Sequence, residues 1–238
     1  LIDADAQANL TMALGYNRPD DIPITLSTVM QNIIDDKTLD VSQGIIHHSE
    51  GVDLLPSNIE LSGFEVRLIN AMSRERVLKT YVNEVKKNYD YVLIDCMPSL
   101  GMITINALAA ADSVIIPTQP HYLSAKGLEL LLRSVSMVKR QINPKLRIDG
   151  ILMTMVMPRT NISKEITATV KSAYGKKIKV FDTEIPHSIR AVEATAEGKS
   201  IFAYDKSGKV AAAYEQLGKE VAEIGEKQRN QNRADRIR

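Results

Sequence analysis

Two aspartates near the start of the sequence, Asp3 and Asp5, could do metal or water chemistry. They stand where an apolar pair, Leu1-Ile2, gives way to a polar segment, as at the carboxyl end of a strand. Carboxylates two positions apart at such a place can hold the water shell of a Mg²⁺ ion or orient an attacking water. The alternative is helix capping, because an aspartate at a helix start interacts favourably with the helix dipole.

A third acid, Asp95, ends the run Tyr91–Asp95, in which four apolar residues precede it. This is the Walker-B pattern, whose aspartate reaches the Mg²⁺ of a nucleotide, although many α/β strands end in aspartate. The segment Ile116–Pro120 follows the next apolar run and either lines a pocket or forms a rigid turn. Ligands bind at the carboxyl ends of strands in an open parallel sheet, so together the three segments predict a site for Mg²⁺ at one sheet edge.

Strands and helices alternate along the chain in the expected pattern. Continuous apolar runs predict parallel strands buried on both faces at 91–95, 113–117 and 150–156. Helices that separate or follow the strands are expected at 6–14, at 27–34 with Ser27 as the N-cap, and at 57–70, 74–87, 101–110, 123–141, 162–174, 188–197 and 208–228. This alternation predicts an α/β fold with a mostly parallel twisted sheet flanked by helices. Residues 1–226 are expected to form a single domain, and residues 227–238, with five bases and one acid, a basic tail.

The overall composition is that of a globular chain: 238 residues, 44% hydrophobic, with a formal net charge of +1. No apolar run is long enough to span a bilayer, and the single cysteine, Cys96, cannot form an internal disulfide, which indicates a reducing, cytoplasmic setting. The charge is sorted along the chain, since residues 1–60 carry a net −8, residues 61–125 a net 0 and residues 126–238 a net +9. The basic part suggests an anionic partner, and uneven loop composition is the alternative.

The phosphate-binding loop that usually accompanies such acids does not occur, because no G-x-x-x-x-G-K-[ST] motif is found in residues 1–238. In P-loop proteins this loop joins the first strand to the first helix. The sequence opens on Leu1-Ile2-Asp3 without a methionine. We therefore expect it to begin inside the fold, with a βα unit of roughly 30 residues before Leu1.

The motifs, taken in order, resemble the ParA/Soj partitioning ATPases, part of the deviant Walker-A group that includes MinD. The two longest matching segments are Leu1–Thr11 (LIDADAQANLT) and Tyr89–Gly101 (YDYVLIDCMPSLG). Shorter matches are found at 104–108, 116–119, 159–161, 185–190, 193–194, 204–205 and 213–214. The chain departs from the family pattern at Met97, where a proline is usual, at His187-Ser188, where Arg-Asn is common, and at Lys209, where arginine is frequent.

The resemblance implies a P-loop NTPase fold of the deviant Walker type, with ATP and Mg²⁺ as cofactors. By position, Asp95 would hold Mg²⁺ through water, Asp5 would position the attacking water and Asp3 would support the metal shell. Met155 and Pro186 fall near the family's adenine pocket. The family's P-loop lysines lie outside residues 1–238, so an intact protein would be an ATPase and these residues alone are expected to be inactive.

The resemblance also implies partners. The family dimerises on ATP, binds duplex DNA without sequence preference, and hydrolyses ATP when a ParB-like centromere-binding protein stimulates it. Arg190 and Lys209 match family positions implicated in DNA contact, and Lys199 and Lys206 lie nearby in sequence. Binding to duplex phosphates requires several basic side chains. The resemblance therefore implies that the basic part of the chain, residues 126–238, contacts DNA. The expected location is cytoplasmic and nucleoid-associated, without a membrane partner.

Two related functions remain as alternatives. A MinD-like membrane-associated positioning ATPase needs a C-terminal amphipathic helix with bulky apolar residues, and residues 226–238 offer only Ile237 of that kind. A relative of the nitrogenase iron protein needs cysteines for an iron–sulfur cluster, and Cys96 is the only cysteine. The four histidines lack metal-ligand spacing and are assigned to surface or packing positions.

Overall fold

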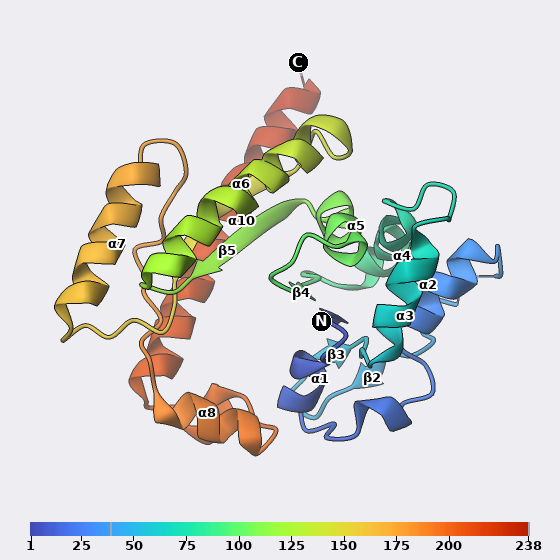
Figure 1. Cartoon of the computed structure of the whole chain (residues 1–238), viewed down its shortest axis with the longest axis horizontal. Coiled ribbons are helices and arrows are strands. Elements are labelled where there is room, and N and C mark those ends of the chain that lie inside the picture. Colours follow the sequence, from blue (N-terminus) through green and yellow to red (C-terminus); the bar gives the residue numbers. More distant parts are fainter. Residues whose placement is uncertain (39, 238) are drawn as a thin grey trace. The chain divides into compact units, whose positions relative to one another are not determined.

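The computed structural model describes residues 1–38 and 40–237, and the side chains of all of these except 123, 125, 229 and 231–237. Two compact units can be distinguished by their internal contacts (Figure 1). The first unit comprises residues 1–112, 131–146 and 194–200, and the second comprises 113–130, 147–193 and 201 onward.

The strands of the first unit bring two of the predicted acids side by side. Strand β1 (Ile2–Ala4) pairs in parallel with β4 (Ile94–Cys96), and the register sets Asp3 opposite Asp95. On its other side Ile2 forms a parallel bridge with Leu55. Leu55 directly follows β3 (Asp53–Leu54), which pairs antiparallel with β2 (Ile46–His47).

Amphipathic helices cover these strands. The predicted apolar spacing of the fourth helix is confirmed, because its five apolar side chains from Val77 to Val85 are all buried. They pack with Phe64, Leu68 and Met30 into one core cluster. The helices of this unit are α1 (Asn9–Ala13), η1 (Pro19–Asp21), α2 (Leu26–Ile34), α3 (Glu60–Leu68), α4 (Val77–Val85), η2 (Lys86–Asn88) and α5 (Met102–Ala110).

The start of α2 corrects one prediction. The N-cap is Thr25 rather than Ser27, and Thr25 forms a capping box with Thr28. The Thr25 backbone N–H donates to Thr28 Oγ1 at 3.3 Å, which fixes the helix two residues earlier than the first serine. Ser27 instead lies within 3.0 Å of Thr25 Oγ1 as a buried hydrogen-bond partner.

The second unit is built on another parallel pair. Strand β5 (Ser113–Thr118) pairs with β6 (Arg147–Met153), and single parallel bridges add Val180 to Ile151 and Pro186 to Val156. Its core includes Leu152, Phe181, Ile185 and Val210. The later helices of the chain are α6 (Tyr122–Gln141), α7 (Asn161–Tyr174), α8 (Ile189–Ala196), α9 (Ile201–Tyr204) and α10 (Lys209–Ile237), of which α6 and α8 are divided between the units.

The predicted α/β fold with parallel strands is confirmed, and two details differ. The run 91–95 is not buried on both faces, because Tyr91 and Leu93 are 55% and 60% exposed. Only the alternate residues Val92, Ile94 and Cys96 pack against the core of the first unit, as the side-chain alternation of a strand covered on one face requires. Residues 227–237, expected as a tail, continue α10, whereas residue 238 lies outside the described residues.

Candidate functional site

Three aspartates converge where β1 and β4 end. Asp3 and Asp95 are register partners, and Asp5 follows β1 by one residue. Desolvation is the main cause that raises the pKa of the Asp95 carboxyl, and the negative charges of Asp3 and Asp5 raise it further. The structure thus brings together the acids that the sequence predicted at one sheet edge, and a cation there would relieve their mutual repulsion.

Asp3 serves the local fold. Its side chain is fully buried, and Oδ2 accepts hydrogen bonds from the Thr11 backbone N–H at 2.9 Å and the Thr11 hydroxyl at 2.7 Å. Oδ1 accepts a third bond from the Asp5 N–H at 3.2 Å. Burial raises the pKa of the Asp3 carboxyl, although these bonds act in the opposite direction. Because its oxygens are bonded to α1 and to the turn, Asp3 positions Asp5.

Asp5 lies in a tight turn that delays the first helix. Its Oδ1 accepts the Gln7 N–H at 2.9 Å, and its carbonyl accepts the Ala8 N–H at 3.0 Å. Ala8 is the N-cap of α1 and has a left-handed backbone with φ of 54°. This conformation is unfavourable for alanine, so the turn holds backbone strain beside the acids. The helix therefore starts at Asn9, three residues later than the apolar pattern indicated.

Two polar residues that the sequence did not single out fix α5, which follows the loop after Asp95. Glu65 of α3 accepts the Ile103 N–H at 3.2 Å, at the start of α5. Gly101 lies directly against the Glu65 carboxylate, so a side chain at 101 would displace it. Asn106 of α5 accepts the Leu78 N–H at 3.1 Å and donates to two backbone carbonyls. A buried amide within an otherwise apolar helix is the sequence signal that could have identified Asn106.

The carboxylates of this site fit a Mg²⁺ ion that is bound to the phosphates of a nucleotide. In residues 1–38 and 40–237 no three His, Cys, Asp or Glu side chains are grouped so as to hold a metal ion by themselves. Mg²⁺ does not need such a group, since it is commonly held by one or two carboxylates together with water and substrate phosphates. Asp95 would supply such a carboxylate, through water, and Asp5 would remain available to orient an attacking water. The third predicted segment, Ile116–Pro120, belongs to the second unit.

The two candidate adenine-pocket residues, Met155 and Pro186, lie beside each other in the second unit. Val156 forms a parallel bridge with Pro186, and its N–H donates to the Ile185 carbonyl at 3.0 Å. Met155 has a left-handed backbone with φ of 51°, and 53% of the residue is exposed. A bulky residue rarely adopts this conformation, and such strain often accompanies a functional role.

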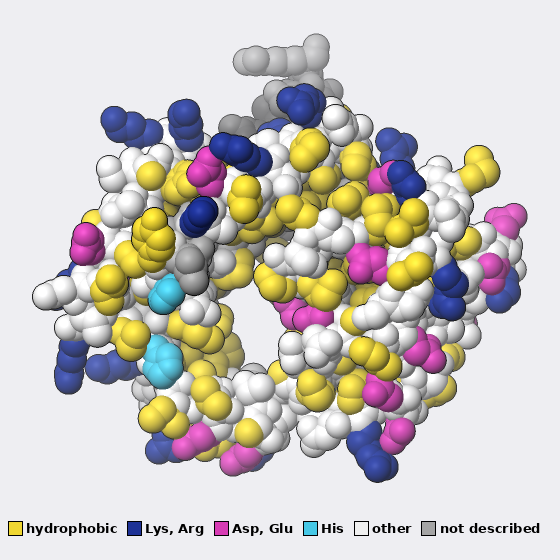
Figure 2. Space-filling view, in the orientation of Figure 1, with side chains coloured by type: hydrophobic (Ala, Val, Ile, Leu, Met, Phe, Trp, Pro, Cys, Tyr) yellow, Lys and Arg dark blue, Asp and Glu magenta, His cyan; other side chains and the backbone are white. Residues whose placement is uncertain are grey.

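The four candidate DNA-binding residues are all exposed, and two of them have acidic partners. Arg190 Nη1 lies 3.4 Å from Glu193 Oε2, and its guanidinium lies 6.0 Å from the Tyr204 ring centroid. Lys199 pairs with Glu197 at 2.8 Å. Figure 2 shows the resulting mixture of basic and acidic side chains over the region of α8, at the lower left. Lys206 lies in the turn before α10, and Lys209 is its first residue.

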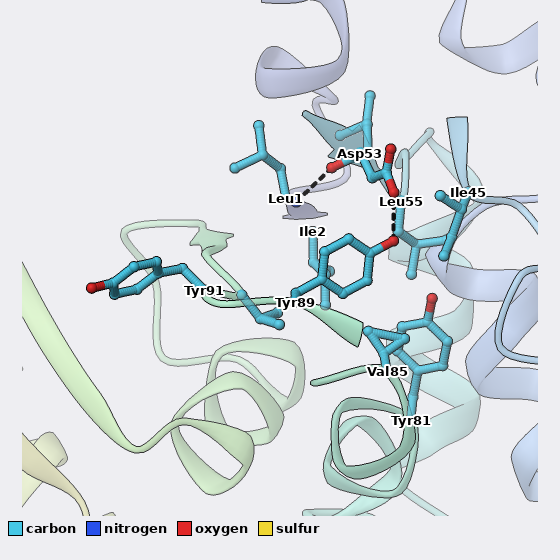
Figure 3. A pocket seen from close by; sticks show the side chains of 11 residues that line it. Leu1, Ile2, Ile45, Asp53, Leu55, Tyr81, Val85, Tyr89 and Tyr91 are labelled. Atoms are coloured by element: carbon cyan, nitrogen blue, oxygen red, sulfur yellow. Dashed lines mark hydrogen bonds between the residues drawn. The ribbon is translucent and has the colours of Figure 1, made fainter. Parts of the chain in front are cut away.

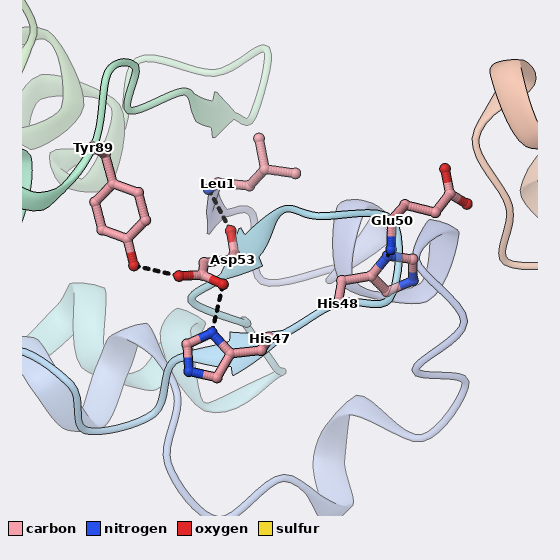
Figure 4. Close-up of polar contacts among 6 residues, drawn as sticks. All are labelled: Leu1, His47, His48, Glu50, Asp53 and Tyr89. Atoms are coloured by element: carbon pink, nitrogen blue, oxygen red, sulfur yellow. Dashed lines mark hydrogen bonds and ion pairs between the residues drawn. The ribbon is translucent and has the colours of Figure 1, made fainter.

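A small pocket lies at the opposite, amino ends of the first unit's strands (Figure 3). Its lining is mainly apolar and includes Tyr81, Tyr89 and Asp53. The Tyr89 hydroxyl donates to Asp53 Oδ2 at 2.6 Å, and His47 Nδ1 lies 2.6 Å from Asp53 Oδ1 (Figure 4). These bonds lower the pKa of Asp53, and the bond to Asp53 raises the pKa of Tyr89 to about 12. The pocket is separate from the acidic site, which lies at the carboxyl ends.

No helix in the described part of the chain combines the length and apolar character that crossing a membrane requires.

Comparisons with known proteins identify the family of the chain. Residues 1–148 match the family model described as an AAA domain. The chain is 40% identical over 226 residues to the sporulation initiation inhibitor protein Soj of Bacillus subtilis (strain 168), covering 94% of this chain and 86% of Soj. It is 36% identical over 223 residues to the chromosome partitioning protein ParA of Myxococcus xanthus, covering 93% of this chain and 76% of that protein.

Solved structures give the same fold. Cobyrinic acid a,c-diamide synthase from Mycobacterium smegmatis, with bound ADP and magnesium, is 33% identical with a TM-score of 0.71 and covers 88% of this chain and 83% of its own. A plasmid partition protein from Borrelia burgdorferi bound to AMPPNP has a TM-score of 0.71 at 24% identity, covering 94% and 85% of the two chains. The cell division ATPase MinD of Pyrococcus furiosus has a TM-score of 0.69 at 20% identity, covering 94% and 84%. The chain therefore has the α/β P-loop NTPase fold and belongs to the ParA/Soj family of partitioning ATPases.

Proposed function

We propose that this chain functions in ATP-dependent DNA partitioning, in an ATPase that dimerises on ATP and binds duplex DNA without sequence preference. A ParB-like partner would stimulate its hydrolysis of ATP. The observation that carries the proposal is the convergence of Asp3, Asp5 and Asp95 at the paired ends of β1 and β4, in a chain 40% identical to Soj. Arg190 of α8, together with Lys199, Lys206 and Lys209, would contact duplex phosphates.

Each acid has a separate role in the proposed hydrolysis. Asp95, whose pKa is raised by desolvation and by its acidic neighbours, gains most from a cation and would hold Mg²⁺ through water. Mg²⁺, when bound with ATP, would neutralise charge on the phosphates. Asp5, at the tip of the turn, would accept a hydrogen bond from the attacking water and orient it. Asp3, buried on Thr11, would keep that turn in place.

We further propose that residues 1–238 alone do not hydrolyse ATP, because they contain the acids but no phosphate-binding loop. Phosphate release should stay at background with the chain alone. It should appear when a P-loop βα unit from a ParA/Soj relative is joined before Leu1, and Asp5→Ala should abolish it in that fusion. Hydrolysis of Mg-ATP by residues 1–238 alone would refute this part of the proposal.

The DNA-binding part is tested by reversing two charges. Arg190→Glu/Lys209→Glu should weaken the affinity for a random-sequence duplex by about tenfold or more, since two phosphate contacts become repulsive. The matched control, Arg76→Glu/Lys86→Glu, reverses an exposed arginine and an exposed lysine of the first unit and changes the net charge equally. Fluorescence anisotropy at fixed salt measures both. Equal losses in the two variants would show a general charge effect, and binding to anionic liposomes instead of DNA would favour the MinD-like alternative.

A further inference from the structure

Two glycines from distant parts of the sequence meet backbone to backbone in the first unit. Gly15 follows α1 and has φ of +90°, and Gly198 follows α8 and has φ of +65°. A Cβ atom added at Gly198 would lie 2.5 Å from Gly15 Cα and 2.9 Å from Gly15 N. Only glycine at 198 permits this approach, because the obstructing atoms are backbone and cannot rotate away.

A second attachment holds the same segment, residues 194–200. The Ser200 N–H donates to Glu50 Oε1 at 3.0 Å, and hydrogen bonding from Ser200 lowers the pKa of the Glu50 carboxyl. Glu50 lies in the turn between β2 and β3, where its own N–H donates to His48 Nδ1 at 3.2 Å. The segment is therefore fixed at two points, by the end of α1 and by the β2–β3 turn.

One of these points leads back to the acidic site. The Gly15 N–H donates to the Met12 carbonyl at 2.9 Å, so Gly15 belongs to the last turn of α1. Thr11, in the same turn, holds the buried Asp3 carboxylate through its N–H and hydroxyl. On the other side of the glycine contact, the residue after Gly198 is Lys199, one of the candidate DNA-binding residues. Fixed contacts thus connect Asp3 to the backbone beside Lys199.

We propose that the Gly15–Gly198 contact is a relay that sets the position of Lys199 according to the conformation of the Asp3–Asp5 turn, and so sets how strongly that lysine contributes to duplex binding. The part that concerns duplex binding rests on the proposed function. A backbone contact without side chains suits this role, because no rotamer change can absorb a shift of α1. A shift of the Asp5 turn then has to move residues 198–200 or separate the two glycines.

The contact is tested in the full 238-residue chain by Gly198→Ala, with Gly51→Ala as the matched control. Both glycines have positive φ, +65° and +79°, but a Cβ at Gly51 meets nothing within 4 Å. Backbone strain is therefore similar in the two variants, and only Gly198→Ala breaks the glycine contact. Amide hydrogen exchange of Lys199, whose N–H donates to the Ala194 carbonyl and not to the β2–β3 turn, should speed up by about tenfold or more in Gly198→Ala and stay near wild type in Gly51→Ala. Equal exchange in both variants would overturn the relay.

Transmission from the acidic site is tested by Thr11→Val, which keeps the side-chain shape but removes the hydroxyl that bonds Asp3. Exchange at Lys199 and Ser200 should rise in Thr11→Val and not in Thr11→Ser. If Thr11→Val fails to fold, Asp3→Asn offers a second perturbation at the same bond. Exchange that changes only within α1, with Lys199 and Ser200 unaffected, would overturn the proposal even if the chain never binds DNA.

The link to duplex binding is tested by a double-mutant cycle. Gly198→Ala should weaken duplex affinity severalfold in the wild-type background and have no further effect in Lys199→Ala, since the contact acts by positioning that lysine. Additive losses would overturn the link to Lys199. A wild-type chain that binds no duplex would refute the proposed DNA binding and this link, while the exchange measurements above still decide the relay itself.

Discussion

At the scale of single residues, Met155 combines a large side chain with a left-handed backbone, φ 51°, two residues after the end of β6. Residues other than glycine adopt this region at a cost of about 1–2 kcal/mol. Replacing Met155 by glycine should raise the free energy of unfolding by about 0.5–1 kcal/mol, after the entropy cost of glycine is subtracted. Urea denaturation monitored by circular dichroism measures it. If Met155 packs on adenine, nucleotide affinity should fall in the same variant.

The control for this prediction is Met157→Gly. Met157 is similarly exposed, at 50%, but is absent from the described non-glycine residues with positive φ. Glycine there should lower stability, because it gains flexibility without relieving strain. A loss of stability in both variants would contradict the assignment of strain to Met155.

The acids show what the residue types alone could predict. Spacing and strand position were enough to place Asp3, Asp5 and Asp95 at one sheet edge. They did not show which acid serves the local fold, because Asp3 acquires that role only from Thr11, eight residues later. Thr11 can reach Asp3 because Ala8 adopts a left-handed backbone and α1 begins at Asn9. The intrinsic propensity of alanine does not indicate this backbone conformation.

At the scale of elements, one carboxylate attaches α10 to the segment that follows α7. Glu220 accepts hydrogen bonds from the backbone N–H groups of Asp182 and Thr183 and from the Thr183 hydroxyl, and it pairs with Lys179 at 3.3 Å. Desolvation opposes ionisation of this largely buried group, but the bonds from Thr183 and Lys179 outweigh it and lower the pKa of Glu220. The ionised form is therefore the one that stabilises the fold.

Glu220→Gln should accordingly lose stability in a pH-dependent way. A carboxyl whose pKa is lowered on folding contributes above its ordinary value, near 4.5, and loses that contribution as the pH falls through the folded pKa. The variant should be less stable by about 1.5–3 kcal/mol at pH 7, and the difference from wild type should shrink as the pH falls below 4.5 and through the lower pKa of the folded state. Denaturation at several pH values measures this.

Glu215→Gln is the matched control on the same helix. Glu215 pairs with Lys219 in an exposed i,i+4 arrangement, 3.0 Å apart, and such pairs contribute about 0.5 kcal/mol or less. A loss for Glu220→Gln that is equally small, or that does not change with pH, would contradict the role given to Glu220.

The sequence predicted an element well where its own apolar spacing determines which face is buried. It predicted an element less well where packing against other elements determines burial. The apolar spacing of α4 placed its buried face correctly. The run 91–95 gave only a three-residue strand, because the exposure of Tyr91 and Leu93 depends on which surfaces pack against β4 and not on their own hydrophobicity. The end of α10 was missed for a different reason. The apolar pattern fades at residue 228, but polar residues that favour helices follow, and the helix continues.

At the scale of the whole molecule, the charge sorting follows the two units. The first unit contains 13 bases and 17 acids, a net −4, whereas the second contains 17 bases and 12 acids, a net +5. The acidic unit holds the three aspartates of the candidate site, of which Asp95 is proposed to hold Mg²⁺, and the basic unit holds Arg190, Lys206 and Lys209. Uneven loop composition would not by itself place the negative charge in the unit with the proposed Mg²⁺ site and the positive charge in the unit with most of the proposed DNA-binding residues.

These two explanations of the basic charge predict different responses to salt. If Arg190, Lys199, Lys206 and Lys209 each neutralise a phosphate, the logarithm of duplex affinity should fall with the logarithm of salt concentration with a slope of about −3 to −4 per chain. Lys206→Gln should reduce that slope by about 1, because one counterion fewer is released. Lys219→Gln, at a lysine already paired with Glu215, should leave it unchanged. Anisotropy titrations between about 50 and 200 mM salt measure the slopes. If Lys206→Gln and Lys219→Gln change the slope equally, the binding depends on overall charge and not on a defined phosphate-binding surface.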